Sequence, residues 1–460
     1  MTTIVPQPSV TTPIPGPRSR HLLDRQSERE SNARTYPRRL PIGIARAQGS
    51  YIEDVDGNVF IDFLTGAGVL ALGHNHPEVV EAVERQLRVL VHGLDFPTPL
   101  KDEFVDLQLS LLPESMRDRM KIQFCGPAGA NAVDAALKLC KTATGRGEIV
   151  AFQGAFHGST HSAMAVTGLV SQKAPIANAM QGVHFFPYPR RNGFPASDEV
   201  SIGEACAQFL RNSLSDPYGG IPLPAAVIME IVQAEGGVLP APRDLVRGVR
   251  DATSDLDVPL IVDEIQTGCG RTGTWFAFEQ HDIVPDVILA SKALGGIGMP
   301  IAVIFYDKRL DTWAPGAHTG TFRGYQPALA AGIAAVKIIQ RDRILENVRE
   351  QSSYAVTRLR ELESRHESVG DVRGLGLMLG LEIVDPDTGK PDAELALAIQ
   401  RGALERGLIL ELGGRYDCVV RLLPPLNVSR ETMDQALGIL DDALASVSRA
   451  QVPPQLAAVR

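Results

Sequence analysis

The segments PLIVDEIQTGCGRTG (residues 259–273) and DVILASKALGGIGMP (residues 286–300) decide the fold class. Each contains a run of apolar residues that ends at charged or polar ones. Runs that are apolar on successive residues are typical of strands buried on both faces of a parallel sheet. Similar runs, separated by helical or loop segments, are KIQFC, EIVAF, AAVIMEI and PIAVIF. The pattern predicts an α/β fold with a mostly parallel sheet and helices on both faces.

In such a sheet the ligand site lies beyond the carboxyl ends of the strands. Asp263 ends one of the two quoted runs and Lys292 follows the other. A desolvated lysine amine can form an imine with a carbonyl. A buried carboxylate needs a cationic partner, which a protonated pyridine nitrogen would supply. The structural alternative is that Asp263 and Lys292 pair with each other or cap nearby helices.

Two further segments carry candidate site residues. CGPAGANAVDAALKLCKTATGR (residues 125–146) runs from a strand through small residues into a helix, and amides at a helix N-terminus suit a phosphate. A tight turn that needs small residues for packing is the alternative. AFHGSTHSAM (residues 155–164) places Phe156 and His157 at a strand end, where a flat ring could stack. An ordinary aromatic core contact is the alternative there.

Composition and charge exclude several classes of protein. Hydrophobic residues make up 44% and charged residues 22%, as in ordinary globular domains. Lys plus Arg is 45 and Asp plus Glu is 54, and the net charge of −9 gives no basis for holding nucleic acid. Apolar runs stop short of a membrane span and no export signal is evident, so we expect a cytoplasmic protein without a membrane partner. Five scattered cysteines predict neither a disulfide framework nor a metal site.

The chain is expected to form two domains with terminal extensions. The Pro-rich N-terminus has no periodicity and predicts a flexible arm or a strap over a partner subunit. GSYIEDVDGNVFIDF (residues 49–63) alternates apolar and polar residues around Asp56 and Gly57, which predicts a hairpin. The predicted divisions are an arm at 1–40, the N-terminal part of a smaller α+β domain at 41–75, a large domain at 76–325, the C-terminal part of the smaller domain at 326–450, and a tail at 451–460.

The order and spacing of nine segments resemble the class III, fold-type I aminotransferases that depend on pyridoxal 5'-phosphate, the ornithine and 4-aminobutyrate type. The segments are IDFLTGAGVLALGHNHP, GPAGANAVDAALK, AFHG, MEIVQAEGG, VDEIQTGCGRTG, SKALGGIGMP, HTGTFRG, RGLGLMLGLE and RLLPPL. The resemblance covers residues 40–445, and its wording is most similar to the 2,4-diaminobutyrate:2-oxoglutarate branch. It implies a fold-type I architecture, pyridoxal 5'-phosphate as cofactor, and a homodimer.

The resemblance also implies residue roles. Lys292 would bind the cofactor aldehyde and move the substrate proton, while Asp263 would keep the pyridine nitrogen protonated. The other implied cofactor contacts are the phosphate at the amides of Ala128, Gly129 and Ala130, the ring faces at Phe156 and Ile265, the ring hydroxyl at Gln266, the pocket wall at His157, and the phosphate again at Thr321 of the second subunit.

Glu230 and Arg421 are the implied substrate-binding pair. The arginine would bind the α-carboxylate of glutamate, and the glutamate would mask the arginine when an ω-amine enters. A plain salt bridge between domains is the alternative. Two half-reactions would then share one site, with ping-pong kinetics.

Three residues depart from the family pattern. Ala128 stands where a hydroxyl residue is common, Ser159 where ornithine and 4-aminobutyrate enzymes have an arginine for the distal carboxylate, and Tyr325 where the diaminobutyrate branch has Asn. L-Glutamate is the expected amino donor and an aldehyde or keto acid the acceptor, with L-2,4-diaminobutyrate and aspartate semialdehyde as the leading pair. The alternatives are a bulkier aldehyde of secondary metabolism, an aminomutase, and a non-catalytic binding or scaffold relative.

Overall fold

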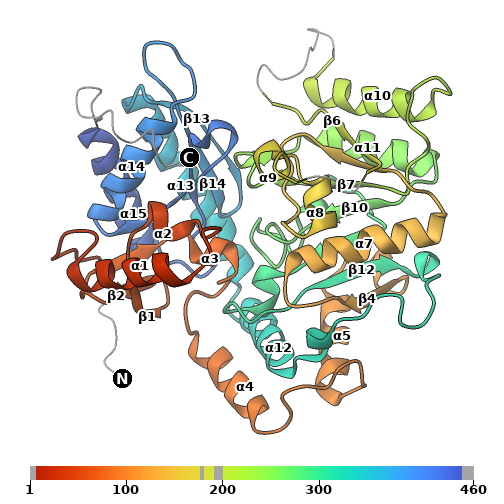
Figure 1. Ribbon diagram of the computed structural model, residues 1–460, viewed down its shortest axis with the longest axis horizontal. Coiled ribbons are helices and arrows are strands. Elements are labelled where there is room, and N and C mark those ends of the chain that lie inside the picture. Colours follow the sequence, from red (N-terminus) through yellow and green to blue (C-terminus); the bar gives the residue numbers. More distant parts are fainter. Residues whose placement is uncertain (1–6, 177–180, 191–199, 448–460) are drawn as a thin grey trace. The chain divides into compact units, whose positions relative to one another are not determined.

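The protein, seen as a computed structural model that describes residues 7–176, 181–190 and 200–447, forms two compact units (Figure 1). The larger unit runs from Glu78 to Leu345, and the smaller unit joins the chain up to Pro77 to the chain from Glu346. Both ends of the chain thus contribute to the smaller unit. None of the helices in the described ranges combines the length and apolar character needed to cross a membrane.

A seven-stranded sheet forms the core of the larger unit, in the order β4-β12-β11-β10-β7-β5-β6. The strands are β4 (Met120–Phe124), β5 (Ile149–Phe152), β6 (Val183–Phe186), β7 (Ala226–Glu230), β10 (Leu260–Asp263), β11 (Val287–Ala290) and β12 (Val303–Asp307). β12 is antiparallel to both β11 and β4, and the other neighbours pair in parallel. The predicted α/β class and mostly parallel sheet are confirmed.

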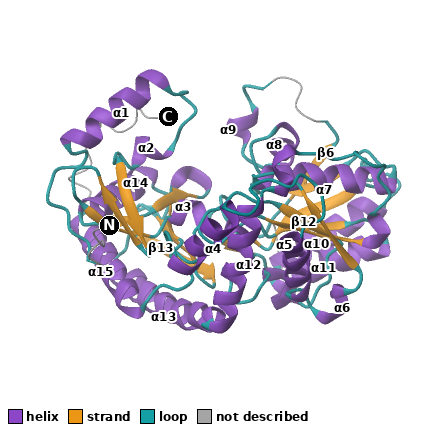
Figure 2. Cartoon of the chain, turned by 90° about the horizontal axis from the view of Figure 1, so that it is seen from below, coloured by secondary structure: helices purple, strands orange, loops and turns teal. Residues whose placement is uncertain are grey.

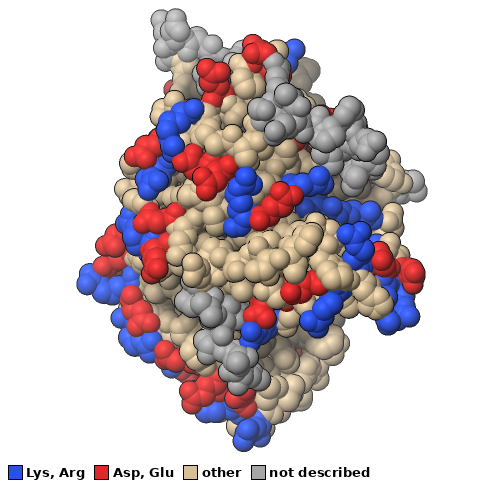
Figure 3. Space-filling view, turned by 90° about the vertical axis from the view of Figure 1, so that its left-hand side faces the viewer, with Lys and Arg blue, Asp and Glu red and all other residues tan. Residues whose placement is uncertain are grey.

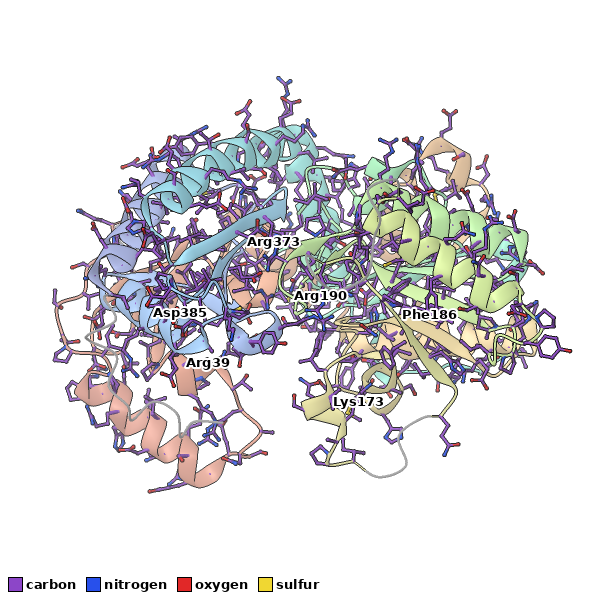
Figure 4. All side chains as sticks on the ribbon, turned by 90° about the horizontal axis from the view of Figure 1, so that it is seen from above. Arg39, Lys173, Phe186, Arg190, Arg373 and Asp385 are labelled. Carbon is purple, nitrogen blue, oxygen red and sulfur yellow. The ribbon has the colours of Figure 1, made fainter. Side chains whose placement is uncertain are left out.

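One strand of this sheet escaped prediction. Six strands coincide with the apolar runs of the sequence, but β6 has the sequence VHFF and lies at the sheet edge. Three of its four residues are only half-buried, so its sequence lacks the uniform apolar character of a central strand. Phe186, at its end, is labelled in Figure 4.

Helices cover both faces of the sheet, and Figure 2 shows α7 on one face and α10 and α11 on the other. The helices of the larger unit are α4 (Pro77–Leu87), α5 (Pro99–Ser110), α6 (Glu114–Arg117), α7 (Gly129–Thr144), α8 (His161–Val166), α9 (Val170–Lys173), α10 (Ile202–Ser215), α11 (Arg243–Asp255) and α12 (Gln326–Arg341). Short elements complete the unit: β8 (Val232–Gln233), β9 (Leu239–Pro240), η1 (Ala277–His281), η2 (Lys292–Gly295), η3 (Lys308–Leu310) and η4 (Thr321–Gly324).

Two expected boundaries differ in the structure. The segment HPEVVEAVERQLRVLVHGL (residues 76–94) has helical periodicity throughout, but α4 ends at Leu87. The residues beyond it contact another loop, since the Gly93 amide donates to the Gly324 carbonyl at 2.9 Å. The unit boundary follows Leu345 rather than residue 325, because α12 packs against α5 of the larger unit.

The smaller unit contains two four-stranded sheets, ordered β1-β2-β3-β15 and β13-β14-β17-β16. Its strands are β1 (Ile44–Gln48), β2 (Tyr51–Asp54), β3 (Val59–Asp62), β13 (Val369–Leu375), β14 (Met378–Ile383), β15 (Leu408–Ile409), β16 (Glu411–Gly413) and β17 (Val419–Leu422). Its helices are α1 (Pro17–Arg29), α2 (Tyr36–Arg39), α3 (Thr65–Gly68), α13 (Ile344–Arg365, which begins in the larger unit), α14 (Ala393–Glu405), α15 (Arg430–Ser446) and the short η5 (Arg415–Asp417). The predicted hairpin is confirmed as β2 and β3.

Ion pairs join segments of the smaller unit that are distant in sequence or lie on facing strands. Arg39 pairs with Asp417 at 2.9 Å, and Arg373 pairs with Glu382 at 2.6 Å across β13 and β14 (Figure 4). Positive and negative side chains lie interspersed on the face drawn in Figure 3.

The N-terminal segment is more ordered than its composition predicted. Residues 17–29 form α1, whose first amides are capped by Asp56 from the β2–β3 turn. The Arg18 amide donates to Asp56 Oδ1 and the Ser19 amide to Oδ2, both at 2.8 Å. The expectation of irregular backbone was wrong there, because the helix is stabilised by a residue far away in sequence. A strap role for this segment stays a prediction.

Candidate active site

A cavity of about 190 Å³ lies at the carboxyl ends of the parallel strands of the larger unit. Its walls come from the start of α7 and from the chain that follows β5, β7, β10 and β11, which is the edge that the sequence predicted. The lining residues are Gly129, Ala130, Phe156, His157, Gly158, Glu230, Val232, Ala234, Glu235, Asp263, Ile265, Gln266, Thr267 and Lys292.

Most of the residues predicted from the sequence meet in this cavity. Ala128 and Thr321 do not line it: Ala128 is the exposed N-cap of α7, and Thr321 is exposed in η4. Arg421 lies fully buried on β17 of the smaller unit, 3.3 Å from Glu411. Because Glu230 and Arg421 belong to different units, their pairing stays a prediction.

Asp263 is held in one orientation by two hydrogen bonds. His157 Nδ1 donates to Asp263 Oδ2 at 2.7 Å, and the Ile265 amide donates to Oδ1 at 3.0 Å. Both side chains are buried, with His157 2% and Asp263 5% exposed. The carboxylate is therefore preorganised at the end of β10. Its hydrogen bond with His157 could not be predicted from the sequence.

His157 lies against the carboxylate of Asp263 at this end of the sheet. Burial lowers the pKa of His157, but its hydrogen bond with Asp263 and the charges of Asp263 and Glu230 outweigh burial and raise that pKa above its ordinary value. Its Nε2 atom is buried and has no hydrogen-bond partner among the residues that the structure describes. A ring nitrogen of this kind is a polar contact offered to a water molecule or a ligand in the cavity.

Glu230 is a second buried carboxylate in the cavity wall. Its Oε1 accepts from the Phe156 amide at 2.9 Å and its Oε2 from the Ala234 amide at 3.2 Å. Burial raises the pKa of Glu230 to about 7, against the opposing charge of His157. The group therefore titrates near neutral pH.

Lys292 adopts a strained backbone. It begins η2 with a φ of 45°, in the left-handed region that non-glycine residues rarely enter. Such conformations cost about 1–3 kcal/mol and concentrate at functional sites. The preceding residue helps to hold the turn, since Ser291 Oγ donates to the Ile301 carbonyl at 2.8 Å.

The start of α7 is closely packed and lines the cavity at Gly129 and Ala130. A Cβ atom on Gly129 would lie 3.0 Å from Ile265 Cδ1, and one on Gly158 would lie 2.7 Å from Ala130 Cβ. The Ala128 amide donates to Asn131 Oδ1 at 3.2 Å, so the amides of Gly129 and Ala130 are better placed for an anion. The packing and phosphate interpretations of this glycine-rich turn are compatible.

Sequence reasoning missed several wall residues. The most significant is Glu235, a half-buried carboxylate on the cavity wall. Glu235 lies in the segment MEIVQAEGG, after Glu230. The spacing of the two acids alone did not indicate which of them has a functional role.

The comparisons with known proteins agree with this geometry. The family of class-III aminotransferases matches residues 33–444, and the chain belongs to that family. It is 48% identical over 440 residues to a diaminobutyrate–2-oxoglutarate aminotransferase of Rhizobium meliloti, covering 93% of each chain. It is 45% identical to a protein of the same name from Haemophilus influenzae, covering 91% of this chain and 93% of that one.

Solved structures share the fold. An amine transaminase from an uncultivated Pseudomonas species, in its pyridoxal-phosphate-bound form, matches with a TM-score of 0.82 and 25% identity over 91% of this chain and 97% of that chain. A Bacillus anthracis aminotransferase matches with a TM-score of 0.84 and 24% identity over 94% and 99% of the two chains. This second likeness concerns the fold alone.

Pyridoxal 5'-phosphate is the cofactor of this class, and the cavity fits it. The fit rests on the glycine cradle at Gly129 and Gly158, the oriented carboxylate of Asp263, the unpartnered Nε2 of His157, and the amine of Lys292 on the same wall. In the described part of the chain, His, Cys, Asp and Glu form no cluster of three or more that could hold a metal ion.

Proposed function

We propose that this aminotransferase moves an amino group between the L-glutamate/2-oxoglutarate pair and the L-2,4-diaminobutyrate/aspartate semialdehyde pair, in two half-reactions at one site. The observation that carries the substrate assignment is the 48% identity to the Rhizobium meliloti enzyme across nearly the whole of both chains. The aminotransferase class favours this over an aminomutase or a non-catalytic scaffold. A cytoplasmic location stays a prediction.

The cavity residues divide the work of catalysis. When bound, the cofactor supplies an aldehyde that exchanges amines and a ring that accepts electrons. Nζ of Lys292 would hold the cofactor at its aldehyde, would release it to the substrate amine, and would then carry the proton that leaves the substrate carbon. Asp263 would keep a proton on the ring nitrogen, and the hydrogen bonds that it accepts from His157 and the Ile265 amide keep it oriented.

Other residues of the cavity wall would bind the cofactor and exclude water from it. The amides of Gly129 and Ala130 at the start of α7 would hold the phosphate. Phe156 and Ile265 would cover the two ring faces and exclude water, and Gln266 would contact the ring hydroxyl. These assignments are supported by the position of all five residues on the wall of one cavity.

Substrate recognition is assigned to Arg421, whose guanidinium would bind the α-carboxylate of glutamate. Ser159 is exposed and cannot bind a distal carboxylate as an arginine would, which disfavours ornithine and 4-aminobutyrate as substrates. A bulkier aldehyde is the second candidate, because Tyr325 replaces the Asn of the diaminobutyrate branch.

A homodimer completes the site in this proposal, with Thr321 contributed to the neighbouring subunit. Thr321 lies beside an exposed apolar surface formed by Leu87, Val89, Leu90, Val91, Leu94, Phe96 and Phe322. Exposed apolar groups of this extent favour a protein–protein contact. Light scattering of V89E should show more monomer than the parent protein, and an equally dimeric V89E would contradict this surface.

Stopped-flow spectroscopy tests the substrate assignment. Purified protein loaded with pyridoxal 5'-phosphate should change its absorption band with L-glutamate and with L-2,4-diaminobutyrate, and aspartate semialdehyde should restore the band after the glutamate step. Restoration only by bulky aldehydes would instead favour the second candidate. A band that no amine changes would contradict the aminotransferase assignment.

A further inference from the structure

The carboxylate of Glu230 joins two loops of the cavity wall. Glu230 ends β7 and is 6% exposed. One of its oxygens accepts from the amide of Phe156, which follows β5, and the other accepts from the amide of Ala234, which follows β8. A single buried side chain therefore fixes the loop that carries Phe156 and His157 relative to the loop that carries Glu235.

The same carboxylate faces a set of titratable groups. His157, on the loop after β5, hydrogen-bonds to Asp263 from β10 at 2.7 Å, and the charges of Asp263 and Glu230 both act on its imidazole. Tyr188, on the chain after β6, donates its hydroxyl to the Glu230 carbonyl at 3.3 Å, and Glu230 helps to raise the pKa of that hydroxyl. Two acids and one imidazole thus share one buried region, and the charge of each depends on the others.

We propose that Glu230 is a positioning residue, which holds the Phe156–His157 loop by its hydrogen bonds and places a carboxylate near the His157–Asp263 pair, and that it does not bind substrate. This inference rests on the proposed function for its kinetic consequences, but its electrostatic part concerns the protein alone. A carboxylate whose two oxygens already bond to backbone amides is fixed in place, whereas a gate for alternate substrates must move.

The first test compares E230Q with E235Q, a change of the same kind on the same wall. The half-reactions of E230Q with L-glutamate and L-2,4-diaminobutyrate should slow together by about tenfold to a hundredfold, with their ratio kept within about threefold. The KM values should change less than the rate constants. If Glu230 masks Arg421 instead, E230Q will change the ratio by tenfold or more, and the inference is overturned.

The second test measures the His157 imidazole in the apoprotein by NMR with selectively labelled histidine, assigned from the spectrum of H157N. E230Q should lower the titration midpoint of His157 by about one pH unit, because a neighbouring negative charge is lost, and E235Q should leave it nearly unchanged. An unmoved midpoint in E230Q overturns the inference. A wild-type enzyme without either half-reaction would remove the proposed function, while this titration would still decide the role of Glu230.

A third measurement needs no variant at Glu230. If Glu230, His157 and Asp263 affect both half-reactions alike, the rate constants of the wild-type enzyme for L-glutamate and for L-2,4-diaminobutyrate should depend on pH with the same midpoint, near neutral pH. Midpoints that differ by more than about one pH unit between the two donors would point to a substrate-binding role and overturn the inference.

Discussion

The larger unit's sheet has a pocket lined by charged groups at each of two edges, the amino ends and the carboxyl ends of its strands. The two pockets differ in how their charged groups are paired. At the amino ends of the strands, a pocket of about 660 Å³ is lined by arginines and aspartates. Arg250 and Arg309 both donate to Asp286 at 2.7 Å, and the Leu260 amide donates to it at 2.9 Å. Burial raises the pKa of Asp286, but Arg250, the Leu260 amide and Arg309 outweigh burial and lower it.

At the carboxyl ends, the smaller cavity pairs Asp263 with His157, whereas Glu230 accepts its two hydrogen bonds from backbone amides. Burial raises the pKa of Glu230 to about 7, and the Nε2 atom of His157 has no partner within the described ranges. Perturbed and incompletely satisfied groups are typical of functional sites, whereas saturated ion-pair networks hold a fold together. The candidate active site is therefore distinguished from the structural pocket at Asp286 by how completely its charged groups are paired, and not by its volume.

The largest expected effect is at Lys292. K292A should reduce transamination by about 10⁴-fold or more, because the chain loses both its nucleophile and its proton carrier. The thermal stability of the apoprotein should change little, since the strained φ of 45° persists in either variant. Steady-state assays and calorimetry check both parts. Retention of more than about a tenth of the activity would contradict the role of Lys292.

Matched Asp→Asn changes at the two edges should separate function from stability. D263N should lower the rate of the glutamate half-reaction by about 10²–10³-fold, because a neutral amide cannot hold the ring nitrogen protonated. D286N should leave that rate nearly unchanged but should lower the free energy of unfolding by about 3 kcal/mol, since it leaves Arg250 without its buried partner. If D263N and D286N changed the rate and the free energy of unfolding in the same way, the proposed difference between the two edges would be contradicted.

A smaller effect is expected from filling the glycine cradle. G158A adds a methyl group that would lie 2.7 Å from Ala130 Cβ, on a backbone with a φ of 128°. It should weaken binding of pyridoxal 5'-phosphate by about tenfold to a hundredfold. G147A is the control, because nothing lies within 4 Å of its added Cβ. Fluorescence titration measures the affinity of each variant for pyridoxal 5'-phosphate. Equal affinities would contradict the role of Gly158 in cofactor binding.

The smallest effect concerns pH and stability. Burial raises the pKa of Glu264 to about 7 from 4.5, against its hydrogen bonds with Thr267 and the Ala277 and Phe278 amides. Its stabilising contribution is therefore present below about pH 4.5 and is lost as the pH rises through about 7. E264Q should reduce the loss of stability of the apoprotein between pH 5 and 8 by about 2 kcal/mol.

D286N is the control for this pH dependence. The lowered pKa of Asp286 means that its contribution is present above the unfolded value of 3.8 and is lost only as the pH falls further. D286N should therefore keep the wild-type slope between pH 5 and 8, as calorimetry over that range would measure. An unchanged slope in E264Q would contradict the assignment to Glu264.

The sequence predicts the sheet and its functional edge because both depend on local patterns. Continuous apolar runs marked the central strands, and Asp263 and Lys292 stood at their ends. The identity of the cofactor was predicted from the family resemblance. What sequence reasoning missed arises from contacts between distant residues: the cap of α1 by Asp56, the hydrogen bond from His157 to Asp263, and the network around Asp286. Tertiary packing creates these, and periodicity contains no information about them.

The central claim is that the amine of Lys292 binds the cofactor aldehyde at this one cavity. The most direct measurement is reduction of the protein with borohydride in the presence of pyridoxal 5'-phosphate, followed by peptide mass spectrometry, with K292R as the control. The account predicts a phosphopyridoxyl group on Lys292 in the parent protein and none at position 292 in the control. A parent protein with no adduct at Lys292, or with the adduct mainly on another lysine, would contradict it.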